Sequence, residues 1–219
     1  DELLAAQASV NGNVSITNQA ELDYVETLIE TDGTPANYII NGNLTITATA
    51  ASFDTGYIAA ISALTAKMAS VIGAVSITTA ATDAALDISQ LTYVSGALAI
   101  VGKMPSGFTV STAASLALTV HEADITLASL TSAAGGVVIT PSATVTTTNV
   151  AIANLTNGAV TTNGSNALVL SLADVNLGAG HPAKTTTVKS LIAGNATTSL
   201  VSTTILASGA VTLGTKVVS

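Results

Sequence analysis

The feature that most constrains this fold is a short recurring pattern, a glycine followed by aliphatic residues two and four positions later. Two copies are nearly identical, VNGNVSI at 10–16 and INGNLTI at 40–46. The pattern recurs at the reference glycines Gly12, Gly42, Gly73, Gly96, Gly135 and Gly209, and in degraded form at Gly158. Such alternation is typical of a strand with one buried face. Each strand is expected to follow a corner at which glycine permits a tight turn.

The aliphatic residues upstream of the glycine repeat as well. Their spacing is the same before Gly96 (Ile88, Leu91, Val94) and before Gly135 (Leu127, Leu130, Ala133). The long interval between these glycines leaves room for an extra repeat without glycine near Leu116, Leu118 and Val120. One repeat cannot bury its own aliphatic residues, but stacked repeats pair at ~4.8 Å and bury a continuous column. The sequence therefore predicts a mainly β fold, a right-handed parallel β-helix (β-solenoid).

Two early intervals between glycines are long, and each contains a helical pattern. Asn18 and Glu21 resemble a capping box, followed by apolar residues on one helical face (Ala20, Leu22, Val25, Leu28, Ile29). A second set recurs at helical spacing (Phe53, Tyr57, Ile61, Leu64, Met68). We expect short N-terminal capping helices that blunt an open sheet edge.

These patterns predict a single β-solenoid domain over residues 1–219. Its parts are N-terminal coils with helical insertions (1–70), regular coils (71–165), and irregular C-terminal coils that contact other subunits (166–219). Within the last part, 175–184 is predicted to be a loop by its glycines and proline.

The stretches LDISQLTYVSGALAI (86–100) and NGNVSITNQAELDYV (11–25) resemble the receptor L-domain type of leucine-rich-like repeat. Its coils follow the pattern L-x-x-L-x-x-V-x-G-x-L-x-I, and bacterial surface members often begin like NGNVTI…QAELD. The similarity covers residues 10–140 and fades in the Thr-rich segments beyond. It implies a right-handed parallel β-helix on an exported, surface-displayed protein, and it implies no catalytic residues.

Composition excludes several partners. The chain is 48% hydrophobic with mean hydropathy +0.62, yet Thr, Ser, Asn and Gly interrupt every apolar run, so no membrane span is expected. The net charge of −8 with no arginine argues against nucleic acid, whose phosphates require clustered cations. The absence of cysteine excludes disulfides and thiolate chemistry. The start at Asp1 favours removal of an export signal, and hence an extracellular or cell-surface location.

Few residues are candidates for chemistry. His121, Glu122 and Asp124 form one titratable cluster, but the second histidine, His181, is 60 residues away. We expect a structural role for this cluster, and turn or strand-edge roles for Asp83 and Asp87. A calcium site of backbone carbonyls and one or two acids stays open, because hard cations need only oxygen ligands. No other cofactor is expected.

An enzyme is not expected either. The chain has no tryptophan, two phenylalanines and four tyrosines, too few for the aromatic platforms of a polysaccharide-cleaving cleft. No G-x-S-x-G, P-loop or H-E-x-x-H motif occurs.

Two further patterns have structural explanations. Threonine rows such as Thr45 and Thr47 suggest ice binding, but they are not expected to recur at one fixed place in successive coils, as ice binding requires. Five N-x-[ST] sequons, at Asn13, Asn43, Asn154, Asn163 and Asn195, are about as many as a Ser/Thr-rich chain produces by chance.

The sequence thus favours a structural subunit of an extracellular filament, sheath or surface layer that self-associates. Seven of the 13 acids lie in the first 32 residues, whereas Lys184, Lys189 and Lys216 lie in the C-terminal part. This asymmetry predicts head-to-tail contacts between subunits. The alternative is an adhesin or carbohydrate-binding module of a larger surface protein or phage fibre, with surface glycans as partners.

Overall fold

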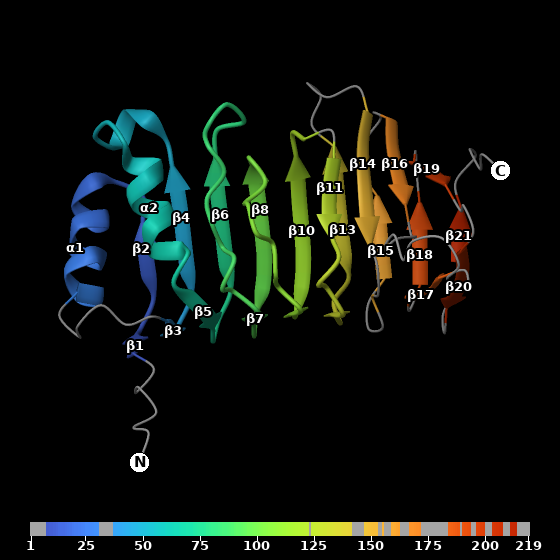
Figure 1. Ribbon diagram of the computed structural model, residues 1–219, viewed down its shortest axis with the longest axis horizontal. Helices are drawn as coiled ribbons and strands as arrows, with labels where there is room; N and C mark the ends of the chain where they lie inside the picture. Colours follow the sequence, from blue (N-terminus) through green and yellow to red (C-terminus); the bar gives the residue numbers. More distant parts are fainter. Residues whose placement is uncertain are drawn as a thin grey trace, which may run out of the picture.

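The computed structural model describes most of the N-terminal two thirds of the chain and a set of strands beyond. The described residues are 8–30, 37–122, 124–141, 147–152, 155, 159–162, 167–171, 184–188, 190–193, 196–199, 203–207 and 211–213. Strands dominate, and Figure 1 shows them side by side along the long axis of the molecule. Of the predicted loop at 175–184, residues 175–183 lie outside these residues, and Lys184 begins a strand.

Two larger parallel sheets organise the structure. Sheet 1 contains, in spatial order, β1 (Ala8–Asn11), β3 (Tyr38–Asn41), β5 (Met68–Val71), β7 (Tyr93–Val94), β9 (Thr112–Ala113) and β12 (Ser132–Ala133). Sheet 2 contains β2 (Val14–Ile16), β4 (Leu44–Ala48), β6 (Val75–Thr79), β8 (Ala97–Gly102), β10 (Ser115–Val120), β13 (Val137–Pro141), β15 (Ala159–Thr162), β18 (Ser190–Ala193) and β21 (Val211–Leu213).

Two smaller parallel sheets follow. Sheet 3 contains β11 (Asp124–Leu127), β14 (Thr147–Ile152), β16 (Ala167–Ser171) and β19 (Ala196–Ser199), and sheet 4 contains β17 (Lys184–Val188) and β20 (Thr203–Ala207). Because the chain passes from sheet to sheet, neighbours within a sheet come from successive repeats. The expected repeat without glycine is present, since β10 pairs with β8 on one side and β13 on the other.

Two helices and a 3-10 turn lie between the early strands. Helix α1 (Gln19–Glu30) links β2 to β3, and η1 (Ala50–Ser52) with helix α2 (Tyr57–Thr65) links β4 to β5. Neither helix is long and apolar enough to cross a membrane, and no other helix occurs among the described residues. The second predicted helix is shorter than its apolar pattern suggested. Phe53 precedes α2 and stacks on Tyr57, while Met68 is buried in β5.

The predicted right-handed parallel β-helix is wrong. In residues 8–79 strands form only two sides of each repeat, and α1, α2 and the segments around them form the return. The ladder of hydrogen bonds therefore does not continue around the repeat. The two large parallel sheets and two helices are consistent with a two-layer α/β fold, and no closed solenoid forms among the described residues.

The core is a column of aliphatic side chains aligned by strand register. Val14, Leu44, Val75, Leu98, Leu116 and Val137 occupy one row across sheet 2, and all are buried. A second buried row, two residues further along each strand, runs Ile16, Ile46, Ile77, Ile100, Leu118 and Ile139. Removal of one such side chain to alanine costs about 2–5 kcal/mol, because neighbouring repeats fill the space around it.

The repeat glycines Gly12, Gly42, Gly73 and Gly96, which we call the glycine ladder, lie where sheet 1 turns into sheet 2. Gly12 has φ +101°, a conformation that favours glycine. Gly42 and Gly73 serve close approach instead, because a Cβ on either would collide with the carbonyl of the preceding ladder glycine. A Cβ on Gly73 would also lie 2.7 Å from Asn43 Oδ1. The Gly96 N–H donates to the Gly73 carbonyl at 2.8 Å.

The backbones of neighbouring repeats approach less closely at the later ladder positions. Ala114 takes the ladder position in the repeat without glycine, where its N–H donates to the Gly96 carbonyl at 2.9 Å. The next position is Gly135, where a Cβ would lie 3.0 Å from the Ala114 carbonyl oxygen. This separation requires a shift of only a few tenths of an ångström.

We therefore expect Gly73→Ala to reduce the free energy of unfolding by about 3 kcal/mol, because backbone atoms on the neighbouring repeat must move. The matched change Gly135→Ala is expected to cost about 1 kcal/mol or less. Urea denaturation followed by circular dichroism measures both. Equal losses in the two variants would contradict the close approach as the cause.

Candidate functional site

The repeat corner also carries polar ladders that sequence reasoning did not predict. The Asn43 N–H donates to Asn13 Oδ1 at 2.9 Å, and the Ala74 N–H donates to Asn43 Oδ1 at 2.8 Å. Asn41 Nδ2 donates to Asn11 Oδ1 at 2.9 Å. The two NGN sequences thus have a structural purpose, since each asparagine joins its own repeat to a neighbour. The sequons at Asn13 and Asn43 fall within this ladder.

Hydroxyl groups form a similar series at the opposite end of the sheet 1 strands, where those strands begin. Ser111 Oγ donates to the Thr92 carbonyl at 3.0 Å, and Thr131 Oγ1 donates to the Ser111 carbonyl at 3.1 Å. Each hydroxyl therefore bonds to the repeat before it. Some of the Ser and Thr side chains in the described repeats thus join neighbouring repeats.

The outward side of sheet 2 is uncharged and formed by small side chains. Register places Thr47, Thr78, Val101, Thr119 and Thr140 in one row across five strands. The expectation that threonines do not share a fixed place is therefore wrong for this row, although Val101 interrupts it. The sequence did not reveal this threonine row because the repeats differ in length, so equivalent positions in successive strands are not equally spaced along the chain.

Helix α1 forms the N-terminal end of the molecule and packs against β2 (Figure 1). The Asn18 side chain accepts from the Glu21 N–H at 3.0 Å, which caps the helix. Glu21 Oε2 accepts from the Thr17 N–H and Thr17 O–H, both at 2.8 Å. The capping box is thus present, with the glutamate reaching the residue before Asn18.

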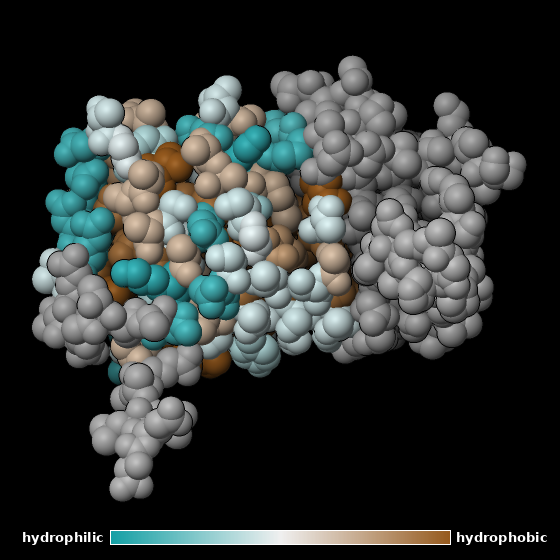
Figure 2. Space-filling model, viewed as in Figure 1, coloured by the Kyte–Doolittle hydropathy of each residue, from teal (hydrophilic) through white to brown (hydrophobic). Residues whose placement is uncertain are grey.

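The inward side of α1 buries Leu22, Val25 and Ile29, but the predicted face is too wide, because Ala20 and Leu28 are exposed. Tyr24 is 64% exposed and Leu28 is 39% exposed. Asp23 lies beside them, and Glu26 lies on the flank. We call Asp23, Tyr24, Glu26 and Leu28 the acidic end surface, which falls along the hydrophilic band at the α1 edge of Figure 2.

The cluster at His121 and Glu122 has a structural setting. Glu122 Oε1 accepts from the Met104 N–H at 2.7 Å and lies 3.6 Å from Lys103 Nζ. The side chain of Asp124 is outside the description, and His181 lies in the undescribed part. No group of three or more His, Asp or Glu in the described residues is placed to hold a metal.

The two other predicted acids have turn roles. Asp83 Oδ2 accepts from the Ala80 N–H at 2.9 Å, and Asp87 Oδ1 accepts from the Ser89 N–H at 2.8 Å. Burial and the neighbouring Asp83 carboxylate raise the pKa of Tyr57, whose hydroxyl donates to Asp83 at 3.4 Å. Both carboxylates therefore stabilise local turns, and Asp83 also contacts Tyr57 of the preceding repeat.

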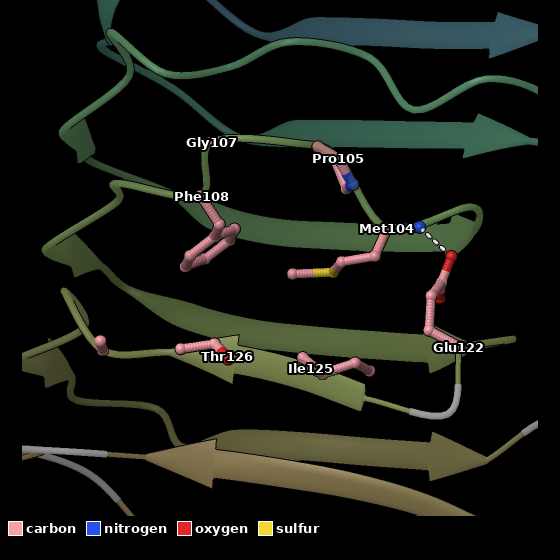
Figure 3. A pocket seen from close by; sticks show the side chains of 8 residues that line it. Met104, Pro105, Gly107, Phe108, Glu122, Ile125 and Thr126 are labelled. Carbon is pink, nitrogen blue, oxygen red and sulfur yellow. Dashed lines mark hydrogen bonds between the residues drawn. The ribbon is translucent and has the colours of Figure 1, made fainter. Parts of the chain in front are cut away.

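A cavity of about 380 Å³ opens beside this cluster (Figure 3). One wall is formed by Met104, Pro105, Gly107 and Phe108, and the other by Ile125, Thr126 and Ala128, with Glu122 at one end. Its volume lies in the range of small-ligand pockets. No sequence signal pointed to it, because its two walls come from different repeats.

Most of the other residues that the sequence singled out lie outside the described residues. Lys184 begins β17, whose side chains are not described, while Lys189, Lys216, Gly158 and Gly209 lie outside the described residues, as do Asn154, Asn163 and Asn195. Their roles stay predictions.

No protein-family model, curated protein or solved structure matches this chain. The resemblance to receptor L-domain repeats therefore stays a prediction.

The Glu21 contacts generate a pH prediction. Hydrogen bonds from Thr17 lower the pKa of Glu21 below its ordinary value of 4.5, because they stabilise the carboxylate. The folded state thus gains stability that is present above pH 4.5 and is lost as the pH falls through the lower folded pKa. We expect the urea midpoint of Glu21→Gln to depend less on pH than that of the unmodified chain between pH 6 and 3. The same slope in both proteins would contradict this.

Proposed function

We propose that this chain is a structural subunit of an extracellular assembly, a filament, sheath or surface layer, and that it forms the assembly by self-association. The observation that carries the proposal is the acidic end surface. An exposed aromatic ring and an exposed leucine lie beside carboxylates at the tip of the molecule. Aromatic residues surrounded by charge are typical of protein contact surfaces.

The arrangement along the chain suits head-to-tail contacts. Helix α1 lies at one end of Figure 1, whereas β17, which begins at Lys184, lies near the other end. The acidic end surface and Lys184 therefore lie toward opposite ends of the same molecule. A heterologous contact between such ends generates an open filament where its rotation does not close into a ring.

The interior is consistent with a structural role. Asparagine, hydroxyl and backbone ladders join each described repeat to the next. The outward side of sheet 2 is uncharged, which permits molecules to pack closely in a sheath or layer without burying unpaired charge.

A charge swap tests the contact. Asp23→Lys is expected to raise the protein concentration required for assembly about two- to tenfold, because it replaces an attraction with a repulsion at an exposed site. Asp54→Lys is the matched control, since Asp54 is an exposed carboxylate that lies outside the acidic end surface. Sedimentation velocity and negative-stain microscopy measure assembly at low salt, because salt screens such contacts.

The reciprocal variant, with Lys184, Lys189 and Lys216 changed to Glu, is expected to restore assembly with Asp23→Lys. Equal effects of Asp23→Lys and Asp54→Lys would contradict the proposed surface. An unmodified chain that stays monomeric at high concentration would overturn the proposed function itself.

A further inference from the structure

Strand β11 is an edge strand whose free side faces the cavity. Sheet 3 has the order β11, β14, β16, β19, so β11 pairs with β14 on one side only. The segment on its other side is 104–108. That segment pairs away from β11: the Ser106 N–H donates to the Leu86 carbonyl at 2.8 Å, and the Ser106 carbonyl accepts from the Ile88 N–H at 3.2 Å. No strand of the described residues covers the free edge of β11.

The chemistry of that edge is fixed by strand geometry. In a parallel sheet, alternate residues of a strand direct their N–H and C=O groups to opposite sides. About half of the backbone groups of β11 therefore point toward the cavity. Such a row of donors and acceptors is matched by another extended backbone.

The lining of the cavity places it along this edge. Ile125 points inward and is buried, whereas Thr126 points outward and is exposed, yet both line the cavity. A space lined by side chains from both faces of a strand lies beside the strand. Figure 3 shows the Phe108 ring directed toward the side of Thr126, and the Met104 side chain extending along the space toward Phe108.

We propose that this cavity binds an extended peptide, which adds to sheet 3 as a strand beside β11. The apolar walls of Met104, Phe108 and Ile125 accept one aliphatic or aromatic side chain of the peptide. The occupant is a neutral or basic peptide, because the chain carries a net charge of −8. Glu122, at one end of the cavity, is itself paired with Lys103. This site lies away from α1, so it is independent of the proposed head-to-tail contact.

The probe is a labelled synthetic peptide, KTVTLTVTK, tested on the full chain by fluorescence anisotropy. Two controls keep its charge and length nearly unchanged. KTVPLPVTK retains the leucine, but its prolines remove the backbone donors that a strand requires, and KTVTDTVTK places a carboxylate in the cavity. We expect binding of the first peptide and at least about tenfold weaker binding of both controls.

A protein variant tests the location. Ala128→Trp fills the cavity from its exposed rim, and Ala117→Trp makes the same change on the exposed outer side of sheet 2. We expect only Ala128→Trp to abolish binding. Hydrogen exchange on the unmodified chain provides a second readout that needs no variant, with slower exchange of amides in 124–127 when the peptide is bound.

Each contrary outcome overturns the proposal. These outcomes are no binding of KTVTLTVTK, equal binding of the proline peptide, equal effects of the two tryptophans, and unchanged exchange in 124–127. None of them bears on assembly through the acidic end surface, which is measured without peptide.

Discussion

The close approach of neighbouring repeats at the glycine ladder is the contact on which the other ladders depend. The backbone of one repeat lies where the Cβ of the next would be, at Gly42 and again at Gly73. This approach aligns the strands that follow, so that the aliphatic rows of sheet 2 meet in register. The asparagine side chains then reach the backbone N–H groups of the following repeat. A side chain at Gly42 or Gly73 would separate these contacts together, whereas Ala114 is accommodated further along the stack.

In such a stack, each interior repeat makes contacts with a repeat on either side. The end of the stack and the edges of its sheets lack one of these neighbours. At the N-terminal end, α1 covers β2 and is held by the cap at Asn18 and by Glu21. Its outward side is the surface proposed for contact between subunits. At the side, the change from helices and loops to the strands of sheet 3 leaves one side of β11 without a paired strand. Both proposed contacts thus follow from places where the repeat begins or changes.

Particular residues show which features of the fold could be predicted from the sequence and which could not. The spacing of Leu116, Leu118 and Val120 correctly located a repeat without glycine, because period-2 alternation survives where glycine does not. Asn18 and Glu21 correctly located the start of a helix, because capping is local chemistry. The predicted closed β-helix was wrong, because the segments that contain α1 and α2 gave no strand ladder on the return side. The row that contains Thr47 and Thr78 was missed, because repeat lengths vary.

The sequence by itself determined the local elements: which residues form strands, which face of each strand is buried, and where glycine is needed. These follow from side-chain period and backbone sterics, which act over a few residues. Only the tertiary structure decided how the strands group into sheets, that β11 keeps a free edge, and that Met104 and Phe108 lie across a cavity from Ile125. These features depend on where the return segment of each repeat lies relative to the next, and no single repeat encodes that relation.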